Sequence, residues 1–265
     1  MIKGFVFPLA IMLATPVLAD GYDCLMDPAE TIDLGSPVSG LLDEVLVDRG
    51  DVVTKGQIVA RLNSAVEQST VELLRTRANS TAVIDAQAEQ LSMVEKRYER
   101  VKQLLEKEVV TVETFDQVEA ELIAAKSLLF QAELNREIAE QELKRAEIVL
   151  RQRTIRSPAD GVVNSRELVP GEYVGNDDHL LTIVKHDPLI IEAFLPVQQF
   201  SAIAVGDTAT ITPAAPLEGT YTATVTSIDS VFDAASATFS VFLELPNPER
   251  KLPAGHRCTL AFDES

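Results

Sequence analysis

The chain has 265 residues, of which 46% are hydrophobic, and its formal net charge is −18 at pH 7. This length and composition allow one large folded domain or two to three small ones, and they exclude a disordered polyanion. The negative charge argues against nucleic-acid binding and against electrostatic docking on anionic lipid, because both need a surplus of Lys and Arg.

The first nineteen residues have the pattern of an export signal. Lys3 supplies a positive charge, and an apolar run follows over residues 5–17. The small residues Val17 and Ala19 stand just before Asp20, so cleavage is predicted between Ala19 and Asp20. The apolar run is shorter than the roughly 20 residues that a membrane span needs, although an uncleaved anchor stays an open alternative.

One short pattern occurs twice in the chain. Residues 36–53 read SPVSGLLDEVLVDRGDVV and residues 157–174 read SPADGVVNSRELVPGEYV, at a constant offset of 121 from Ser36 to Ser157. We name them the first and the second half-motif. In and beside both half-motifs, apolar runs alternate with turns, and this alternation predicts short strands. The glycines of these turns are Gly40, Gly50, Gly56, Gly161 and Gly171. A repeat split by an insertion predicts two half-domains that join in space.

The segment between the half-motifs is predicted to be helical, since it has no Gly or Pro from Gln57 to Ser157. Ser64 and Glu67 form a capping-box pattern at its start. The apolar residues of its first arm recur at spacings of three and four at Leu91, Val94, Tyr98, Val101 and Leu105. The first arm is expected to end near Lys107.

The second arm carries a heptad seam. Its positions are Phe115, Val118, Leu122, Ala125, Leu129, Ala132, Arg136, Ala139, Leu143, Ala146 and Leu150. Thr111, with Thr114 three positions on, is the predicted cap of this arm. Because few residues join the arms, they are expected to be antiparallel, each roughly 60 Å long. A polar outer face is expected from Glu119, Glu121, Lys126, Glu133, Glu137, Glu140 and Lys144.

The remainder of the chain is expected to be all β. Apolar or alternating segments lie at residues 180–184, 189–195, 208–212, 221–228, 238–245 and 258–262, after one short strand near residues 31–34. A short helix is predicted at residues 197–204. Short strands at this spacing favour a small antiparallel barrel.

Two cysteines, Cys24 and Cys258, lie near opposite ends of the chain. In an oxidising compartment they could form a disulfide, and two free thiols are the alternative that the sequence leaves open. The three histidines are scattered and no Cys/His cluster has ligand spacing, so no metal or other cofactor is expected.

The order of these segments resembles the periplasmic adaptor subunits, or membrane fusion proteins, of the HlyD-like family. The resemblance rests on the sequences GDVVTKGQ at residues 50–57, IRSPADGVV at residues 155–163 and LPAGH at residues 252–256. It implies a mainly β fold: a split lipoyl-like β-sandwich (a barrel-sandwich hybrid) with a long antiparallel coiled-coil hairpin, plus a small antiparallel β-barrel. The implied segments are a signal peptide (1–19), an N-terminal segment with the first half-motif (20–63), the hairpin (64–152), the second half-motif (153–185) and the barrel (186–265).

The resemblance also implies a docking site at the hairpin tip. Adaptors that dock onto a TolC-type outer-membrane channel have Arg, then Leu four residues on, then Ser seven further. Arg100, Leu104 and Thr111 have these spacings, with Thr in place of Ser. The alternative is that Arg100 is only solvated and Thr111 is only a helix cap.

The implied function is that of a non-catalytic periplasmic adaptor. Such a protein forms a ring, a trimer or a hexamer, between an inner-membrane RND or ABC transporter and the outer channel. The chain stops after the last barrel strand at Ser265, without the further domain of many RND adaptors, so the class of pump is left open.

Three other functions are alternatives to this one. A type I secretion adaptor for a protein substrate is one alternative. A lipoyl or biotinyl carrier is disfavoured because residues 61–64, where such a domain presents its lysine, contain none. A hydrolase is disfavoured because the chain lacks Gly-x-Ser-x-Gly and His-Glu-x-x-His motifs.

Overall fold

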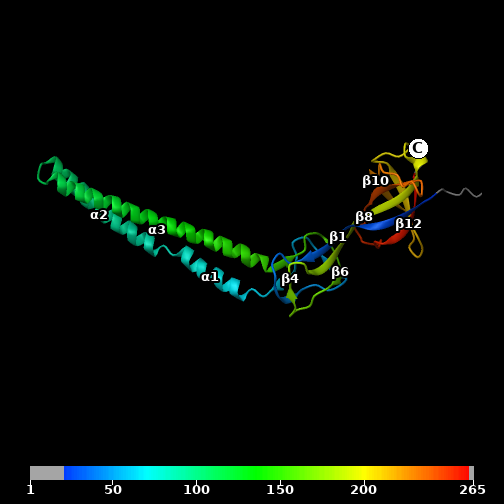
Figure 1. Ribbon diagram of the computed structural model, residues 1–265, viewed down its shortest axis with the longest axis horizontal. Helices are drawn as coiled ribbons and strands as arrows, with labels where there is room; N and C mark the ends of the chain where they lie inside the picture. Colours follow the sequence, from blue (N-terminus) through cyan, green and yellow to red (C-terminus); the bar gives the residue numbers. More distant parts are fainter. Residues whose placement is uncertain (1–20, 263–265) are drawn as a thin grey trace, which may run out of the picture. The chain divides into compact units, whose positions relative to one another are not determined.

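The structure is a computed structural model that describes residues 21–262. The predicted signal peptide, with its cleavage between Ala19 and Asp20, lies outside these residues. The described chain forms two compact units (Figure 1). One contains residues up to Ile32, a short segment at 159–164 and everything from Thr182 onward, and the other contains residues 33–158 and 165–181.

The first unit is a six-stranded β-barrel. Its strands follow the order β1 (Tyr22–Gly35), β12 (His256–Phe262), β9 (Thr208–Pro213), β10 (Tyr221–Ile228), β11 (Thr238–Leu245) and β8 (His179–Pro196), and a pairing of β1 with β8 closes it. Inward residues alternate with outward ones along each strand, so one set of apolar side chains fills the interior. Phe239, Ile191, Leu195, Ile211 and Leu243 are among those with almost no exposed surface.

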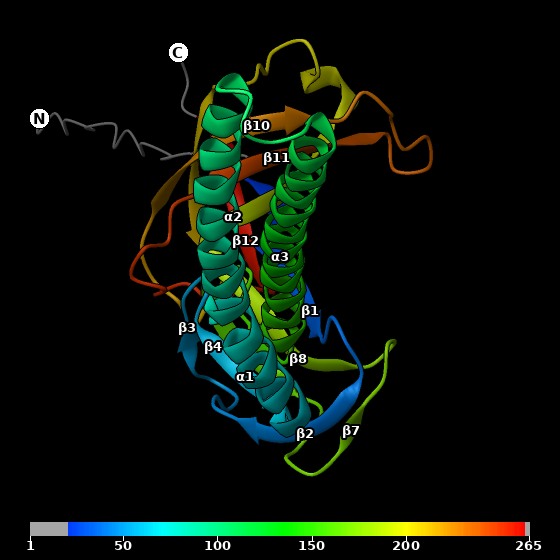
Figure 2. The same cartoon turned by 90° about the vertical axis from the view of Figure 1, so that its left-hand side faces the viewer.

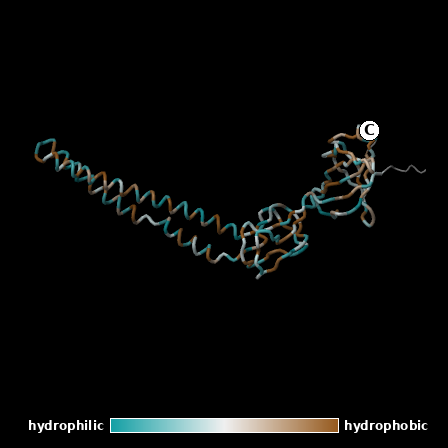
Figure 3. Tube along the Cα trace, in the orientation of Figure 1, coloured by the Kyte–Doolittle hydropathy of each residue, from teal (hydrophilic) through white to brown (hydrophobic). Residues whose placement is uncertain are grey.

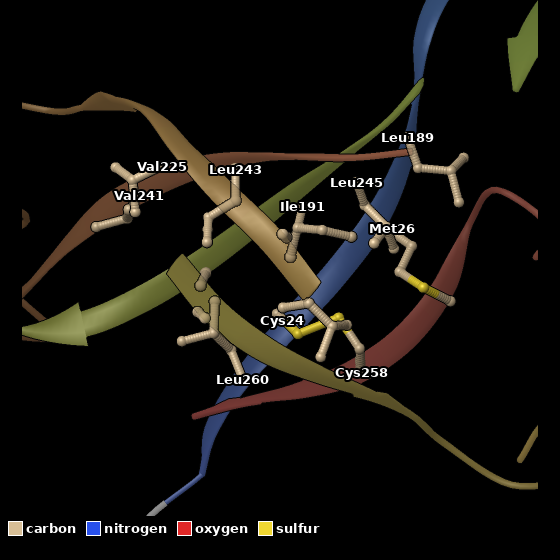
Figure 4. Packing of buried hydrophobic residues seen from close by; sticks show 14 of the residues in the cluster. Cys24, Met26, Leu189, Ile191, Val225, Val241, Leu243, Leu245, Cys258 and Leu260 are labelled. Carbon is tan, nitrogen blue, oxygen red and sulfur yellow. A yellow bond between two sulfur atoms is a disulfide. The ribbon is translucent and has the colours of Figure 1, made fainter. Parts of the chain in front are cut away.

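A disulfide joins the first and last strands of the barrel. Cys24 and Cys258 are directly paired in the β1–β12 register, their Cα atoms are 4.9 Å apart, and both are buried. Figure 4 shows the bond among the core side chains, near Met26 and Leu260. The two cysteines therefore hold together segments that lie 234 residues apart in the sequence.

Two strands are longer than the sequence patterns predicted. The strand expected near residues 31–34 is part of the 14-residue β1, whose beginning pairs with β12 in the barrel. The two segments expected at residues 180–184 and 189–195 form one strand, β8, through the cis Asp187–Pro188 bond. The helix expected at residues 197–204 is only a short 3-10 turn, η1 (Val197–Gln199).

Both half-motifs contribute strands to a sandwich, which belongs to the second unit except for residues 159–164. The first half supplies β2 (Gly40–Val45), β3 (Val52–Val53) and β4 (Ile58–Leu62), and the second half follows the insertion with β5 (Thr154–Arg156), β6 (Gly161–Arg166) and β7 (Tyr173–Val174). One sheet has the order β5-β4-β2-β7, so strands from one half lie on both sides of strands from the other. The two halves thus form one body, as the split repeat predicted.

The turns of the two half-motifs close in the same way. Gly50 and Gly171 have φ angles of +95° and +94°, a conformation that favours glycine. In each turn the carboxylate of the next residue accepts a hydrogen bond from the backbone. Asp51 accepts from the Asp48 N–H at 2.8 Å, and Glu172 accepts from the Val169 N–H at 2.8 Å. The two half-motifs therefore share both the glycine conformation of the turn and the hydrogen bond from the backbone to the carboxylate.

The insertion folds into three helices instead of two. They are α1 (Ala65–Asn79), α2 (Ala82–Glu106) and α3 (Val112–Gln152), and α1 and α2 both pack along α3 (Figure 2). The first arm was expected to be continuous, but it is interrupted at Ser80, which is extended. Thr81 stands directly before α2, and its hydroxyl donates to the Asp85 carboxylate at 2.8 Å.

The expected capping box at the start of α1 is wrong. Ser64 precedes the helix but makes no side-chain capping bond to it. Its hydroxyl accepts instead from the Gln68 side chain at 2.9 Å, and the Glu67 carboxylate accepts from Arg153 at 2.7 Å. The Glu67 carboxylate, which a capping box would have required, therefore joins the two ends of the hairpin through Arg153.

The heptad seam of α3 faces the other two helices. Of its eleven positions only Arg136 is exposed, and the alanines Ala125, Ala132 and Ala139 are buried. On α2 the partly buried positions are Ile84, Gln87, Leu91, Val94, Tyr98, Val101 and Leu105, which continue the predicted spacing. Small side chains on α3 thus allow close packing along the arm.

The outer face of the hairpin is less polar than expected. The predicted charged residues are exposed, apart from the partly buried Glu121, but Ile123, Phe130, Leu134 and Ile138 are exposed on α3 among them. Hydrophobic and polar residues alternate along both arms (Figure 3). The seam explains only one of the two apolar faces of α3.

Arg153 connects the base of the hairpin to the sandwich. Its guanidinium donates to the Ser39 carbonyl at 3.0 Å and to the Glu67 carboxylate at 2.7 Å. Both side chains of the ion pair are largely buried, with 21% of Arg153 and 17% of Glu67 exposed. This pair joins the start of α1 to the end of α3.

We expect Glu67→Gln to lower the free energy of unfolding of the hairpin base by about 2 kcal/mol, because it leaves a largely buried guanidinium without its counter-charge. Faster hydrogen exchange of the Gln68 amide, which donates to the Ser64 carbonyl, and of the Leu62 amide, which donates to the Arg153 carbonyl, would measure this. Glu72→Gln is the matched control, since Glu72 is exposed and its pairing with Arg75 is weak. Equal exchange in both variants would contradict the proposed connection.

Candidate docking site at the hairpin tip

The tip of the hairpin is a tight turn between α2 and α3. The Glu108 and Val109 amides donate to the Leu105 and Leu104 carbonyls at 2.8 and 2.9 Å, which terminates α2. Glu108 has a φ of +59°, a position where glycine is usual. The chain therefore reverses direction within five residues and presents Val109 to solvent, with 67% of its surface exposed.

The three residues that the resemblance singled out all lie in this distal region. Thr111 precedes α3, as predicted, and its Oγ1 accepts from the Thr114 N–H at 3.3 Å and lies 2.9 Å from the Thr114 hydroxyl. Leu104 is exposed in the last turn of α2, and Arg100 is exposed one turn earlier. The hydroxyl of Thr111 thus serves as a helix cap, and its methyl group adds to the exposed surface.

Sequence reasoning missed the most exposed apolar residues of the tip. Val109 and Val112 stand on either side of Thr111, and each has more than 60% of its surface exposed. Together with Leu104 they form an apolar cap on the hairpin, which we call the tip patch. The sequence did contain a signal for these residues, namely the β-branched side chains in the turn between two helices. A turn that contacts only water does not need apolar side chains.

We expect Glu108→Gly to stabilise the tip turn by about 0.5 kcal/mol, because glycine adopts the positive φ without steric cost. Slower hydrogen exchange of the Val109 amide would measure it. Glu99→Gly is the control within α2, where glycine should instead cost about 1 kcal/mol. Faster exchange of the Val109 amide in Glu108→Gly would show that Glu108 is not strained at its positive φ.

The barrel has an apolar groove of its own. Phe194, Val231, Phe232 and Phe239 line it with Asp229 and Asp233 at its side, over a volume of about 560 Å³. Phe200 packs edge-on against Phe232 and Phe239 at centroid distances of 5.0 and 5.3 Å. The backbone N–H of Ala235 and the Ser236 hydroxyl lower the pKa of the Asp233 carboxyl, which lies at the side of this groove.

Neither carrier nor metal chemistry is visible in the described part of the chain. The connection from β4 to α1 is Asn63–Ser64, which offers no lysine for a lipoyl or biotinyl group. Within residues 21–262 no group of three or more His, Cys, Asp or Glu is arranged to hold a metal ion. None of the helices described there is long and apolar enough to cross a membrane.

Two family models match the chain along most of its length. Residues 30–185 match the CzcB-like barrel-sandwich hybrid domain, and residues 189–265 match the CusB-like β-barrel domain. The chain belongs to the membrane fusion proteins. These are periplasmic adaptors of efflux systems, and they are not enzymes. The glycines Gly40, Gly50, Gly56, Gly161 and Gly171 lie within the first of these matches.

Individual relatives resemble this chain in sequence or in fold. The nodulation protein NolF of Rhizobium meliloti is 26% identical over 230 residues, covering 87% of this chain and 59% of that protein. This chain thus spans about three fifths of the length of that relative. MacA from Actinobacillus actinomycetemcomitans is 21% identical with a TM-score of 0.75, covering 92% of this chain and 78% of MacA. Spr0693 of Streptococcus pneumoniae is 14% identical with a TM-score of 0.57, covering 92% of this chain and 99% of that one.

Proposed function

We propose that this membrane fusion protein bridges an inner-membrane RND or ABC transporter and a TolC-type outer-membrane channel. The hairpin tip docks the channel, the barrel docks the transporter, and several copies form a ring, a trimer or a hexamer. The observation that carries this proposal is the tip patch of Leu104, Val109 and Val112, because an apolar cap at the end of a roughly 60 Å arm needs a partner surface.

The proposed roles divide the chain as follows. Residues 1–19 are a signal peptide that is cleaved before Asp20, so the protein works in the periplasm. Residues 64–152 are a coiled-coil hairpin, held by the half-motif segments 20–63 and 153–185. Residues 186–265, with the start of β1, form the barrel, whose Phe194 and Phe232 groove receives the transporter.

We assign a distinct role to each of three tip residues, Arg100, Leu104 and Thr111. The Leu104 side chain and the neighbouring valines fill a gap between the hairpin ends of the channel. The Arg100 guanidinium donates to the channel's backbone or side chains. Thr111 fixes the start of α3, and its hydroxyl can still accept a bond from the partner.

The test is site-specific photo-crosslinking in intact cells. A photoreactive residue at position 111 or 109 should capture an outer-membrane channel, and one at position 231, on the barrel groove, should capture a transporter. Gln131, exposed midway along α3, is the control on the shaft of the same hairpin. If position 231 captures a transporter and no tip position captures a channel, the docking assignment is wrong.

A further inference from the structure

A groove lies along one flank of the helix pair α1 and α3, at the base of the hairpin. The two helices pack on each other there and belong to the same compact unit (Figure 1). The groove has a volume of about 400 Å³, which is within the range of pockets that hold small molecules. We call it the base groove.

The walls of the base groove are mainly apolar. Val66 and Leu74 of α1 and Ala146 and Val149 of α3 line it. On α1 the residue buried against α3 is Val71, on the neighbouring face of the helix, and on α3 the seam offers only a methyl group at Ala146. The groove is therefore left unfilled, and 74% of Val66 and 40% of Val149 are exposed.

Four polar residues line the base groove as well, and three of them are already bonded inside the chain. Glu67 and Glu142 each accept from an arginine, at 2.7 and 3.3 Å, and the Thr70 hydroxyl donates to a carbonyl of its own helix at 2.8 Å. The fourth is Arg145, whose guanidinium has no ion pair with another residue of the described part of the chain. The groove thus has one uncommitted charge, and this charge is positive.

The ion pairs of Glu67 and Glu142 also fix the register of the two antiparallel helices. In this register Arg145 lies level with Leu74. From Leu74 back to Val66, α1 extends over eight residues, or about 12 Å. The positive charge therefore stands near one end of the groove, and an apolar wall continues from it toward the start of α1.

We propose that the base groove binds a soluble amphiphilic anion, a molecule with one sulfonate or carboxylate group and an apolar body of rings or an acyl chain. The Arg145 guanidinium donates to the oxygens of the anionic group. The apolar body lies along Leu74 toward Val66, where it removes exposed apolar surface from water. This site is separate from the docking surfaces of the proposed function and does not depend on them.

The net charge of −18 does not oppose such a ligand at short range. Both carboxylates that line the groove are paired with arginines, so they add no net negative charge beside Arg145. Exposed charges farther away are screened beyond about 10 Å at moderate ionic strength.

The first test uses two fluorescent probes for apolar sites that differ by one group, 1-anilinonaphthalene-8-sulfonate and its uncharged parent N-phenyl-1-naphthylamine. On the purified full chain, Arg145→Gln should weaken binding of the sulfonate about tenfold and change the affinity for the parent less than about twofold, because only the sulfonate uses the guanidinium. Lys144→Gln is the matched control, since Lys144 is the exposed neighbour and its loss changes the net charge equally. Equal affinity for the sulfonate in both variants, or an equal loss of both probes in Arg145→Gln, would overturn the proposal.

The second test fills the groove. Thr70→Trp places an indole between the two walls and should lower the number of molecules of either probe bound per chain by about one. Thr76→Trp is the matched control, because Thr76 is also exposed on α1 and its hydroxyl also donates to the carbonyl four residues earlier. Helical circular dichroism checks that both variants are folded. Equal probe binding by the two variants would remove the base groove as the site.

The same titrations distinguish a small molecule from a second copy of this chain as the occupant. Probe binding per chain should stay constant as the protein concentration rises. A fall that accompanies self-association in the wild type, and that Thr70→Trp does not show, would assign the groove to a second copy and overturn the proposal.

Discussion

Replacing both cysteines in the Cys24→Ser, Cys258→Ser variant should lower the free energy of unfolding of the barrel by about 3–5 kcal/mol. The disulfide closes a loop with a sequence separation of 234 residues, and long loops lose the most unfolded-state entropy when they are closed. It also joins the strand at each end of the described chain, β1 and β12, where fraying would begin.

Because the two units need not unfold together, the measurement should be specific to the barrel. Hydrogen exchange of the β11 amides reports it, since β11 lies in the barrel sheet and carries buried Phe239, Val241 and Leu243. Wild-type protein under reducing conditions should lose the same stability, and Thr259→Ser on the exposed side of β12 should lose little. If the free energy of unfolding of the barrel falls by less than about 1 kcal/mol in the double variant, the backbone pairing of β1 with β12 closes the barrel without the disulfide.

Placing a carboxylate in the hairpin seam should have the second large effect. We expect Ala132→Glu to destabilise the helices by about 3 kcal/mol or more, because the side chain at this buried d position has neither space nor a partner for its charge. The apposition of α2 and α3 near the middle of the arm is then lost. An adaptor with separated arms should no longer connect its two partners.

Thermal loss of helical circular dichroism measures this change, since α1, α2 and α3 contain the α-helical residues of the described chain. Ala124→Glu is the matched control: it is the same substitution on the same helix at an exposed position. The barrel should keep its β11 exchange rates in both variants. Equal melting of Ala132→Glu and Ala124→Glu would show that the seam does not hold the arms together.

Much of the fold could be read from the local pattern of the sequence. The split half-motifs, the heptad seam and the alternating strands of β9 to β12 each depend on neighbours a few residues apart, so periodicity reveals them. The Gly50 and Gly171 turns could be recognised for the same reason. Arg100, Leu104 and Thr111 could be placed near the tip because a heptad arm has a known rise per residue.

Other features depend on which distant residues meet. Ser64 and Glu67 look like a capping box until Arg153, brought back by the return arm, takes the carboxylate. The sequence could not say that residues 22–26 would pair with β12, and the pairing of Cys24 with Cys258 follows from that register.

By itself, then, the sequence determined the order of segments: a half-sandwich, a helical arm, the second half-sandwich and a barrel. Only the tertiary structure decided which faces of the arm are covered. A period of seven places Ala132 in the seam and Phe130 outside it, but it cannot say whether another element covers the face that carries Phe130, which is exposed in the structure. That difference arises because a hairpin of this kind buries one face of α3, and the other face is free for a further surface.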